Sequence, residues 1–232
     1  MAGDLLTSLD VGALDMRDIV MTTPGADRAT SETVSFKRIG LSRLIDGRIG
    51  GFVLEGVGAG KDDARLDAER IEISGLDVRA PLAAAASADP RPAAPQFDRL
   101  EIAGLAMAMP DGPVSLGRAV IEARDWMEVA PTKLTARLER AVLSLSGAGA
   151  ARGALLAALG YDKIDLSGAL EAKFDAQKGE LTIDRLEADG AGMGAARASL
   201  MLSRVPAAIF SGDMQAAQFA LPAIAFWRAD VG

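Results

Sequence analysis

Pairs of carboxylates at short spacing are the residues of this chain best suited to chemistry. The pairs are Asp15 with Asp18, Glu69 with Glu72, and Asp184 with Glu187. Two carboxyl groups can serve as the acid and base of a glycosidase-like site, provided that an enclosing cleft shifts the pKa of one of them. Apolar and charged residues alternate around these pairs. That pattern is typical of the solvated face of a strand, which is the interpretation we favour.

Other forms of active-site chemistry find little support in the composition. The chain has no histidine and no cysteine, so the commonest general base, metal ligand and thiol nucleophile are missing. Asp62, Asp63, Asp67 and Glu69 could attract Ca²⁺, but the order of residues in an EF-hand loop is absent. We therefore predict no cofactor, no metal ion and a protein that is not an enzyme.

Two glycine-rich stretches resemble nucleotide-binding loops only superficially. Residues 56–62 (GVGAGKD) have Asp62 where a Walker A loop needs Ser or Thr, and Glu55 where it needs the first glycine. Residues 190–194 (GAGMG) lack the spacing of a dinucleotide fingerprint. We predict a surface loop at the first stretch and a bulge or turn at the second.

The overall composition favours a folded chain that does not bind nucleic acid. Half of the 232 residues are hydrophobic, whereas aromatic residues make up only 4%. An interior lined by Leu, Ile, Val, Ala and Met is thin and leaves room for a groove. The formal net charge is −7, and basic residues are scattered singly among acids. Phosphate binding needs clustered Lys and Arg, so we predict no nucleic-acid partner.

A short phrase recurs along the chain. Residues 70–78 (RIEISGLDV) return as residues 99–107 (RLEIAGLAM), with weaker copies at 163–170 and 185–190. The phrase has the period-two alternation of a strand, interrupted at a glycine where a strand would bulge or turn. We predict that the two clear copies have equivalent conformations, with Gly75 and Gly104 at matching bends.

Further elements complete the expected architecture. Residues 170–175 and 181–184 alternate strictly around a loop that ends at Gly179, which predicts a hairpin. Asp46-Gly47 predicts a tight turn, and residues 149–159 and 211–225 predict two short helices. Residues 81–95 are rich in Ala and Pro and predict a flexible loop. The predicted fold is mainly β: one elongated domain over residues 1–232, with a curved antiparallel sheet built from strand–Gly–strand units.

The repeated phrases, together with residues 44–57 and 156–166, resemble uncharacterised envelope proteins of alphaproteobacteria, whose repeats are similar to those of the AsmA-like family of β-rich periplasmic proteins. The resemblance implies a curved sheet with an apolar concave face, a periplasmic location and a role in lipid handling or envelope maintenance. The chain shows no signal peptide, so we expect that such a segment has been removed.

These observations lead to one functional hypothesis and one alternative. We predict a non-enzymatic protein of the periplasm or envelope that binds or shelters a lipid or other hydrophobic ligand along an apolar sheet face. The expected lining residues are Ile71, Ile73, Leu100, Ile102, Leu105, Met107, Leu170, Phe174, Leu181 and Ile183. The alternative is a structural or assembly module whose strand edges pair with an envelope protein or with a second copy.

Overall fold

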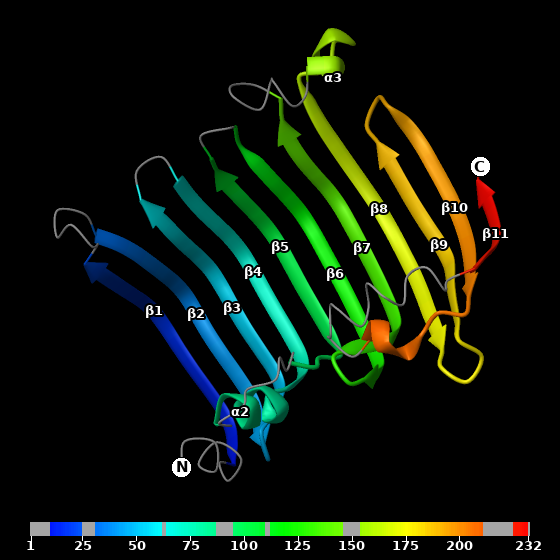
Figure 1. Cartoon of the computed structure of the whole chain (residues 1–232). Coiled ribbons are helices and arrows are strands. Elements are labelled where there is room, and N and C mark those ends of the chain that lie inside the picture. The colour runs from blue at the N-terminus through cyan, green and yellow to red at the C-terminus, as the bar shows by residue number, and fades with distance from the viewer. Residues whose placement is uncertain are drawn as a thin grey trace.

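The described residues form one antiparallel sheet of eleven strands, in which every strand pairs with its neighbours in sequence (Figure 1). The computed structural model describes residues 10–24, 31–61, 64–86, 95–109, 112–145, 154–210 and 225–231. The strands are β1 (Val11–Pro24), β2 (Ser31–Ile45), β3 (Arg48–Lys61), β4 (Ala64–Asp77), β5 (Arg99–Ala108), β6 (Val114–Met127), β7 (Ala130–Ser144), β8 (Lys163–Asp175), β9 (Glu180–Gly190), β10 (Gly194–Ser203) and β11 (Ala225–Val231).

Within the described residues, helical structure is limited to short segments between strands. They are α2 (Arg79–Ala86), α3 (Ala154–Ala158) and the 3₁₀ helix η2 (Ala207–Phe210). None of the helices in the described part of the chain is long and apolar enough to cross a membrane. The fold is therefore formed by strand pairing, and the helices lie in the connections between strands.

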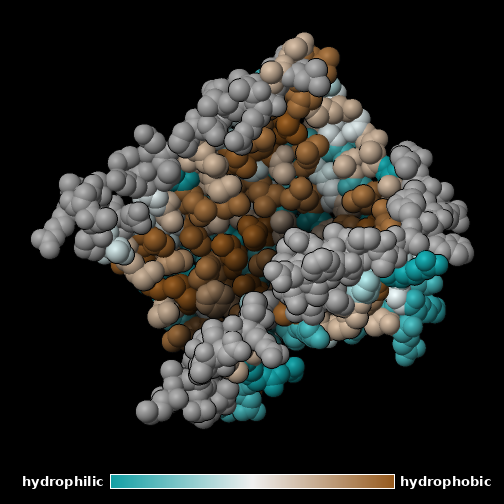
Figure 2. Space-filling view, in the orientation of Figure 1, coloured by the Kyte–Doolittle hydropathy of each residue, from teal (hydrophilic) through white to brown (hydrophobic). Residues whose placement is uncertain are grey.

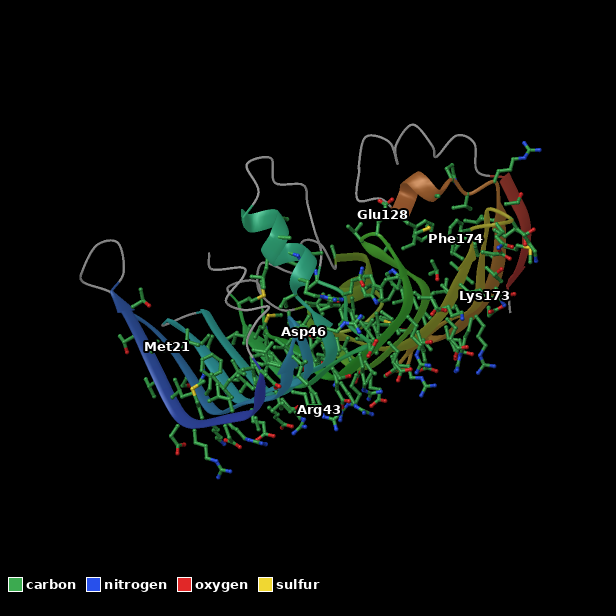
Figure 3. The ribbon with its side chains drawn as sticks, turned by 90° about the horizontal axis from the view of Figure 1, so that it is seen from below. Met21, Arg43, Asp46, Glu128, Lys173 and Phe174 are labelled. Carbon is green, nitrogen blue, oxygen red and sulfur yellow. The ribbon has the colours of Figure 1, made fainter. Side chains whose placement is uncertain are left out.

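The sheet is curved into a trough, which confirms the predicted fold class. Seen along its edge, the ribbon curls around the side that carries α2 and η2, and most of the charged side chains point away from the opposite, outer face (Figure 3). Phe174 points into the trough and the preceding Lys173 points outward, as alternation along a strand requires.

The first seven strands each contain one residue in the left-handed backbone conformation. These residues are Asp18, Arg43, Gly56, Gly75, Gly104, Asp125 and Arg140, with φ between 52° and 65°. A left-handed residue interrupts the extended backbone and bends the strand. Each left-handed residue occupies the same place in a six-residue pattern. Positions one, three and six of the pattern are apolar and position five is the left-handed residue, as in Leu100–Leu105.

The bends line up across the sheet in two creases. In the odd-numbered strands, the left-handed residues Asp18, Gly56, Gly104 and Arg140 fall on the first crease. In the even-numbered strands, Arg43 and Gly75 fall on the second, whereas Asp125 of β6 lies two residues beyond the position, Ala123, that continues this line. Across a crease the residues that face the trough are spaced i, i+3, as Ile102 and Leu105 are, instead of i, i+2. Because both strands of a pair change to this i, i+3 spacing at the same crease, the register is unbroken through six consecutive pairs.

The prediction of matching bends in the two clear copies is confirmed. Gly75 has φ 65° and Gly104 has φ 60°, and both lie inside strands. A Cβ at Gly104 would overlap the Glu69 side chain, and one at Gly75 would overlap Asp98. The weaker copies in β8 and β9 are strands as expected, but Gly168 and Gly190 do not have positive φ values.

Two predicted turns are also confirmed. In the hairpin of β8 and β9, Phe174 lies opposite Leu181 and Gly179 has φ 64°. At the turn between β2 and β3, Asp46 and Gly47 both have positive φ, which is the signature of a type I′ hairpin turn.

Two predicted loops are partly wrong. Residues 81–86 belong to α2, because Pro81 occupies the first turn, where a missing N–H costs nothing, and the Asp77 carboxylate accepts a hydrogen bond from the Arg79 N–H at 3.0 Å. Residues 56–61 of the predicted loop at 56–62 belong to β3, which pairs with β2 and β4, and residue 62 lies outside the described residues. The predicted helix at 149–159 is partly confirmed by α3. Residues 211–224 of the other predicted helix, and residues 87–94 of the predicted Ala/Pro-rich loop, lie outside the described residues.

Candidate functional site

The inner face of the trough is built from rows of apolar side chains that cross the strands. The first, which we call the Leu100 row, runs from the free edge at β1 to β10 through residues directly opposite one another. Its members are Leu14, Leu41, Phe52, Ile73, Leu100, Ile121, Ala136, Leu170, Leu186 and Ala198. Unbroken register is what keeps these residues in one line.

Two further rows lie on the same face. The Ile102 row comprises Met16, Ile39, Leu54, Ile71, Ile102, Ala119 and Leu138. The Met107 row, beyond the first crease, comprises Met21, Val34, Ala59, Leu66, Met107, Val114, Leu143 and Ile164. Figure 2 shows the result as a broad apolar surface over the middle strands (Figure 2).

The predicted lining residues all belong to strands of this sheet, and they fall into two groups. Ile71, Ile73, Leu100, Ile102, Leu105 and Met107 form one patch on β4 and β5. Leu170 shares the Leu100 row with them, separated by Ile121 and Ala136. The sequence prediction missed Ile121, Phe52 and Leu54, although partial alternation in their strands signals them.

Phe174, Leu181 and Ile183 lie at the far end of β8 and β9, where the chain covers its own sheet. The ring of Phe174 stacks on Phe210 of η2, with 4.2 Å between the ring centroids. Phe174 is accordingly only 8% exposed. This end of the trough is therefore filled from within, unlike the patch on β4 and β5.

The rest of the inner face is only half-covered. The other nine predicted lining residues are partly exposed, and the described part of the chain contains no large side chain that is fully buried. The fold thus leaves an apolar surface accessible, which is the feature that an apolar ligand needs.

The outer face carries ladders of ion pairs. One ladder runs from Asp15 through Arg38, Glu55 and Arg70 to Glu72, with closest N···O distances of 2.6 to 3.5 Å. A second centres on Glu101, which accepts from Arg99 at 2.7 Å and from Arg118 at 2.8 Å. The hydrogen bonds from Arg118 and Arg99 lower the pKa of Glu101 to about 2.

The acidic pairs singled out by their spacing belong to this outer face. Glu72 is bound by Arg70 at 2.8 Å, Asp184 by Lys173 at 3.0 Å and Glu187 by Arg185 at 2.5 Å. The Arg185 hydrogen bond lowers the pKa of Glu187, which is the opposite of the shift that a general acid requires. The structure therefore brings Asp15, Glu72, Asp184 and Glu187 to arginine and lysine partners. Asp18 and Glu69 instead line one hollow together.

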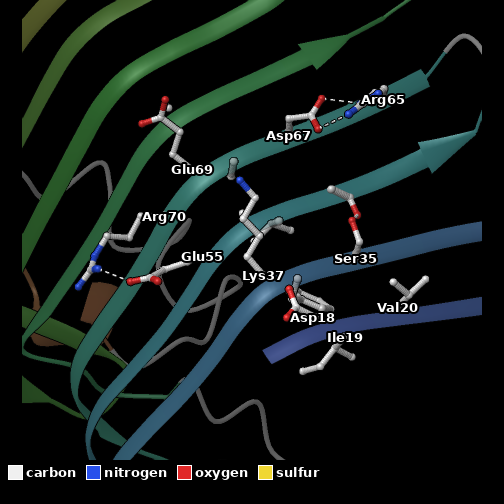
Figure 4. Close-up of a pocket in the computed structure, with 16 residues that line it drawn as sticks. Asp18, Ile19, Val20, Ser35, Lys37, Glu55, Arg65, Asp67, Glu69 and Arg70 are labelled. Atoms are coloured by element: carbon white, nitrogen blue, oxygen red, sulfur yellow. Dashed lines mark hydrogen bonds and ion pairs between the residues drawn. The ribbon is translucent and has the colours of Figure 1, made fainter. Parts of the chain in front are cut away.

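A hollow of about 1020 Å³ opens on the outer face over β2 to β4 (Figure 4). Its lining includes Gly56 and Gly58 of β3, which the side chains of Lys37 and Ser35 approach closely. Four of its seven charged lining residues pair with each other: Arg65 with Asp67 at 2.7 Å and Arg70 with Glu55 at 2.6 Å. A polar ligand would have to compete with these pairs, so the hollow is a weaker candidate than the trough.

Within the described ranges, no cluster of three or more acidic residues is arranged to hold a metal ion. Comparison with protein-family models, curated proteins and solved structures finds no significant match to this chain. The candidate site therefore stands on its geometry: a trough of partly exposed apolar rows that cross β4 to β6.

Proposed function

We propose that the protein is a non-enzymatic envelope protein that binds a lipid acyl chain, or a ligand of similar apolar chemistry, along the inner face of the trough. The observation that carries this proposal is the continuity of the three apolar rows on a face that the described chain leaves half-exposed. A sheet with one apolar face must cover it with helices, a second sheet, a partner or a ligand.

The shape and chemistry of the surface favour an elongated apolar occupant. The central patch consists of aliphatic side chains and Met107, with no charged group among the row members. Burial of apolar area contributes about 25 cal/mol per Å², and flexible methionine adapts to ligands of varied shape. The proposed periplasmic location follows from the AsmA-like resemblance of the repeats, and fractionation of cells that produce the native protein would test it.

Lipid extraction of the purified protein provides the direct test. We expect organic extraction and native mass spectrometry to reveal co-purified lipid, and a fluorescent polyene fatty acid to bind the delipidated protein. The matched variants are Ile121→Gln and Val120→Gln, which alter adjacent residues of β6 on opposite faces of the sheet. Because Ile121 lies in the Leu100 row, its polar replacement should weaken probe binding about tenfold, a loss of roughly 1.4 kcal/mol.

The outer-face variant should bind the probe within about twofold of the unaltered protein. Circular dichroism and thermal unfolding establish that both variants remain folded. The proposal is wrong if the unaltered protein yields no lipid and binds no probe. Equal effects of the two substitutions would also contradict it, since they would show that binding does not use the trough.

A further inference from the structure

We propose that the free edge of β1 pairs with β1 of a second copy of the chain, so that two troughs join into one continuous sheet. Among the described residues, β1 pairs with β2 alone, and its other edge is open. The strand is long and its apolar side chains are exposed, with Leu14 at 46% and Met16 at 39%. An edge of this kind is a template for pairing.

The internal strands show how a neighbour of β1 must be placed. In each of β1 to β5, the residue three positions before the left-handed residue lies opposite its equivalent in the next strand. These equivalents are Asp15, Gly40, Val53, Glu72 and Glu101, which form one row across the sheet. One placement rule therefore governs four consecutive strand pairs, and β1 obeys it on its paired edge.

A second β1 satisfies the same rule on the free edge. Applied to two copies of β1, the rule puts Asp15 opposite Asp15 on a two-fold axis. Leu14 then lies opposite the partner's Met16, so the Leu100 row of one copy continues into the Ile102 row of the other. The left-handed Asp18 falls opposite the partner's Gly12, which is the position in β1 that lies on the second crease. Both creases thus cross the junction without interruption.

The pair formed by β4 and β5 is an internal example of this junction. There Glu72 lies opposite Glu101, and the arginines two residues before each acid, Arg70 and Arg99, flank the two carboxylates. Two like charges directly opposite one another are unfavourable unless such flanking cations neutralise them. In the β1 junction Arg17, two residues from Asp15, takes this flanking role. Arg17 is 72% exposed and forms an ion pair with Asp15 of its own strand at 3.4 Å.

Disulfide cross-linking tests the register directly, because the chain has no cysteine of its own. The Cα atoms of residues opposite each other in an antiparallel pair are about 4.5 to 5.5 Å apart, within the range that a disulfide bridges. Asp15→Cys should therefore give a covalent dimer under mild oxidation. Val20→Cys is the control, because Val20 is on the same strand and is 66% exposed, but in this register the two copies of residue 20 are about 30 Å apart.

Charge reversal tests the same junction without a covalent bond. The dissociation constant of the dimer, measured by analytical ultracentrifugation, should rise at least tenfold in Arg17→Glu, which places acids beside both copies of Asp15. Arg124→Glu makes the same charge change at an exposed position of β6 and should leave the constant unchanged. A monomeric unaltered protein at tens of micromolar, together with no Asp15→Cys dimer, would overturn the proposal. Equal cross-linking at residue 20 would overturn it too, as would head-to-tail polymers that join β1 to β11.

Discussion

Strands β1 to β7 and strands β8 to β11 achieve their curvature differently. In the first region each strand bends at a left-handed residue, neighbouring strands bend together, and the register never shifts. In the second region each pair, including β7 with β8, shows a register shift. Within β8, β9 and β10 the only residue with positive φ is Gly194, at the start of β10. A crease keeps side-chain rows intact, whereas a bulge in one strand displaces them.

The difference has a functional consequence. The three apolar rows are unbroken over the creased strands, where the inner face stays half-exposed. In the bulged region only the Leu100 row continues as far as β10, and η2 covers Phe174. The creased region is therefore the part of the molecule in which all three apolar rows are continuous, and in the bulged region η2 covers one end of the sheet at Phe174 while Leu186 stays 43% exposed.

The largest expected effect comes from blocking a crease. Gly104→Ala should lower the free energy of unfolding by about 2–3 kcal/mol, because alanine is strained at φ 60° and its Cβ overlaps Glu69. Chemical denaturation measures the change. Gly12→Ala is the control, because Gly12 lies on the second crease without positive φ and a Cβ there meets no atom within 4 Å. A loss below 0.5 kcal/mol at Gly104, on the order of the control, would show that the crease does not depend on left-handed glycine.

An intermediate effect is expected from the ion pairs on the outer face. Glu101→Gln should cost about 1–2 kcal/mol at neutral pH, because the carboxylate is only 17% exposed and is held by two arginines. Asp184→Asn, in the bulged region, removes a partner of Lys173 that is 49% exposed. That change should cost less than about 0.5 kcal/mol.

The pH dependence sharpens the same comparison. The pKa of Glu101 is about 2 in the folded protein, below its ordinary value of 4.5. Its contribution to stability is therefore fully present above about pH 5 and is lost as the pH falls toward 2. Denaturation curves of the unaltered protein and of Glu101→Gln should converge over this interval. Curves that remain separated to the same extent at acid pH would contradict the assignment.

The smallest expected effect is a gain in stability. Arg140 is left-handed with φ 54°, a conformation that is unfavourable for a side chain with a Cβ. Arg140→Gly should raise the free energy of unfolding by about 0.5 kcal/mol. The same change at Arg137, in the same strand without positive φ, should lower it by about 0.5–1 kcal/mol. Thermal unfolding of the two variants, measured in parallel, tests this difference. A loss of stability in both variants would show that the backbone at Arg140 is not strained.

The sequence by itself determined the strands and some of their turns. Alternation identified the hairpin of β8 and β9, and Asp46-Gly47 identified the turn after β2, because both signals are local. The repeat revealed the bends at Gly75 and Gly104, since glycine marks a left-handed position. The equivalent bends at Asp18, Arg43, Asp125 and Arg140 were missed, because a residue other than glycine does not by itself indicate the left-handed conformation.

Only the tertiary structure decided which residues line up and which stay exposed. The predicted patch of Ile71, Ile73, Leu100 and Ile102 is continuous because β4 and β5 pair in one register, and Phe174 is buried because η2 reaches it from 33 residues farther along the chain. Register depends on the agreement of neighbouring strands at each crease, and burial depends on segments remote in sequence. Period-two alternation states that a strand has an apolar face, but it contains no information about what lies opposite that face.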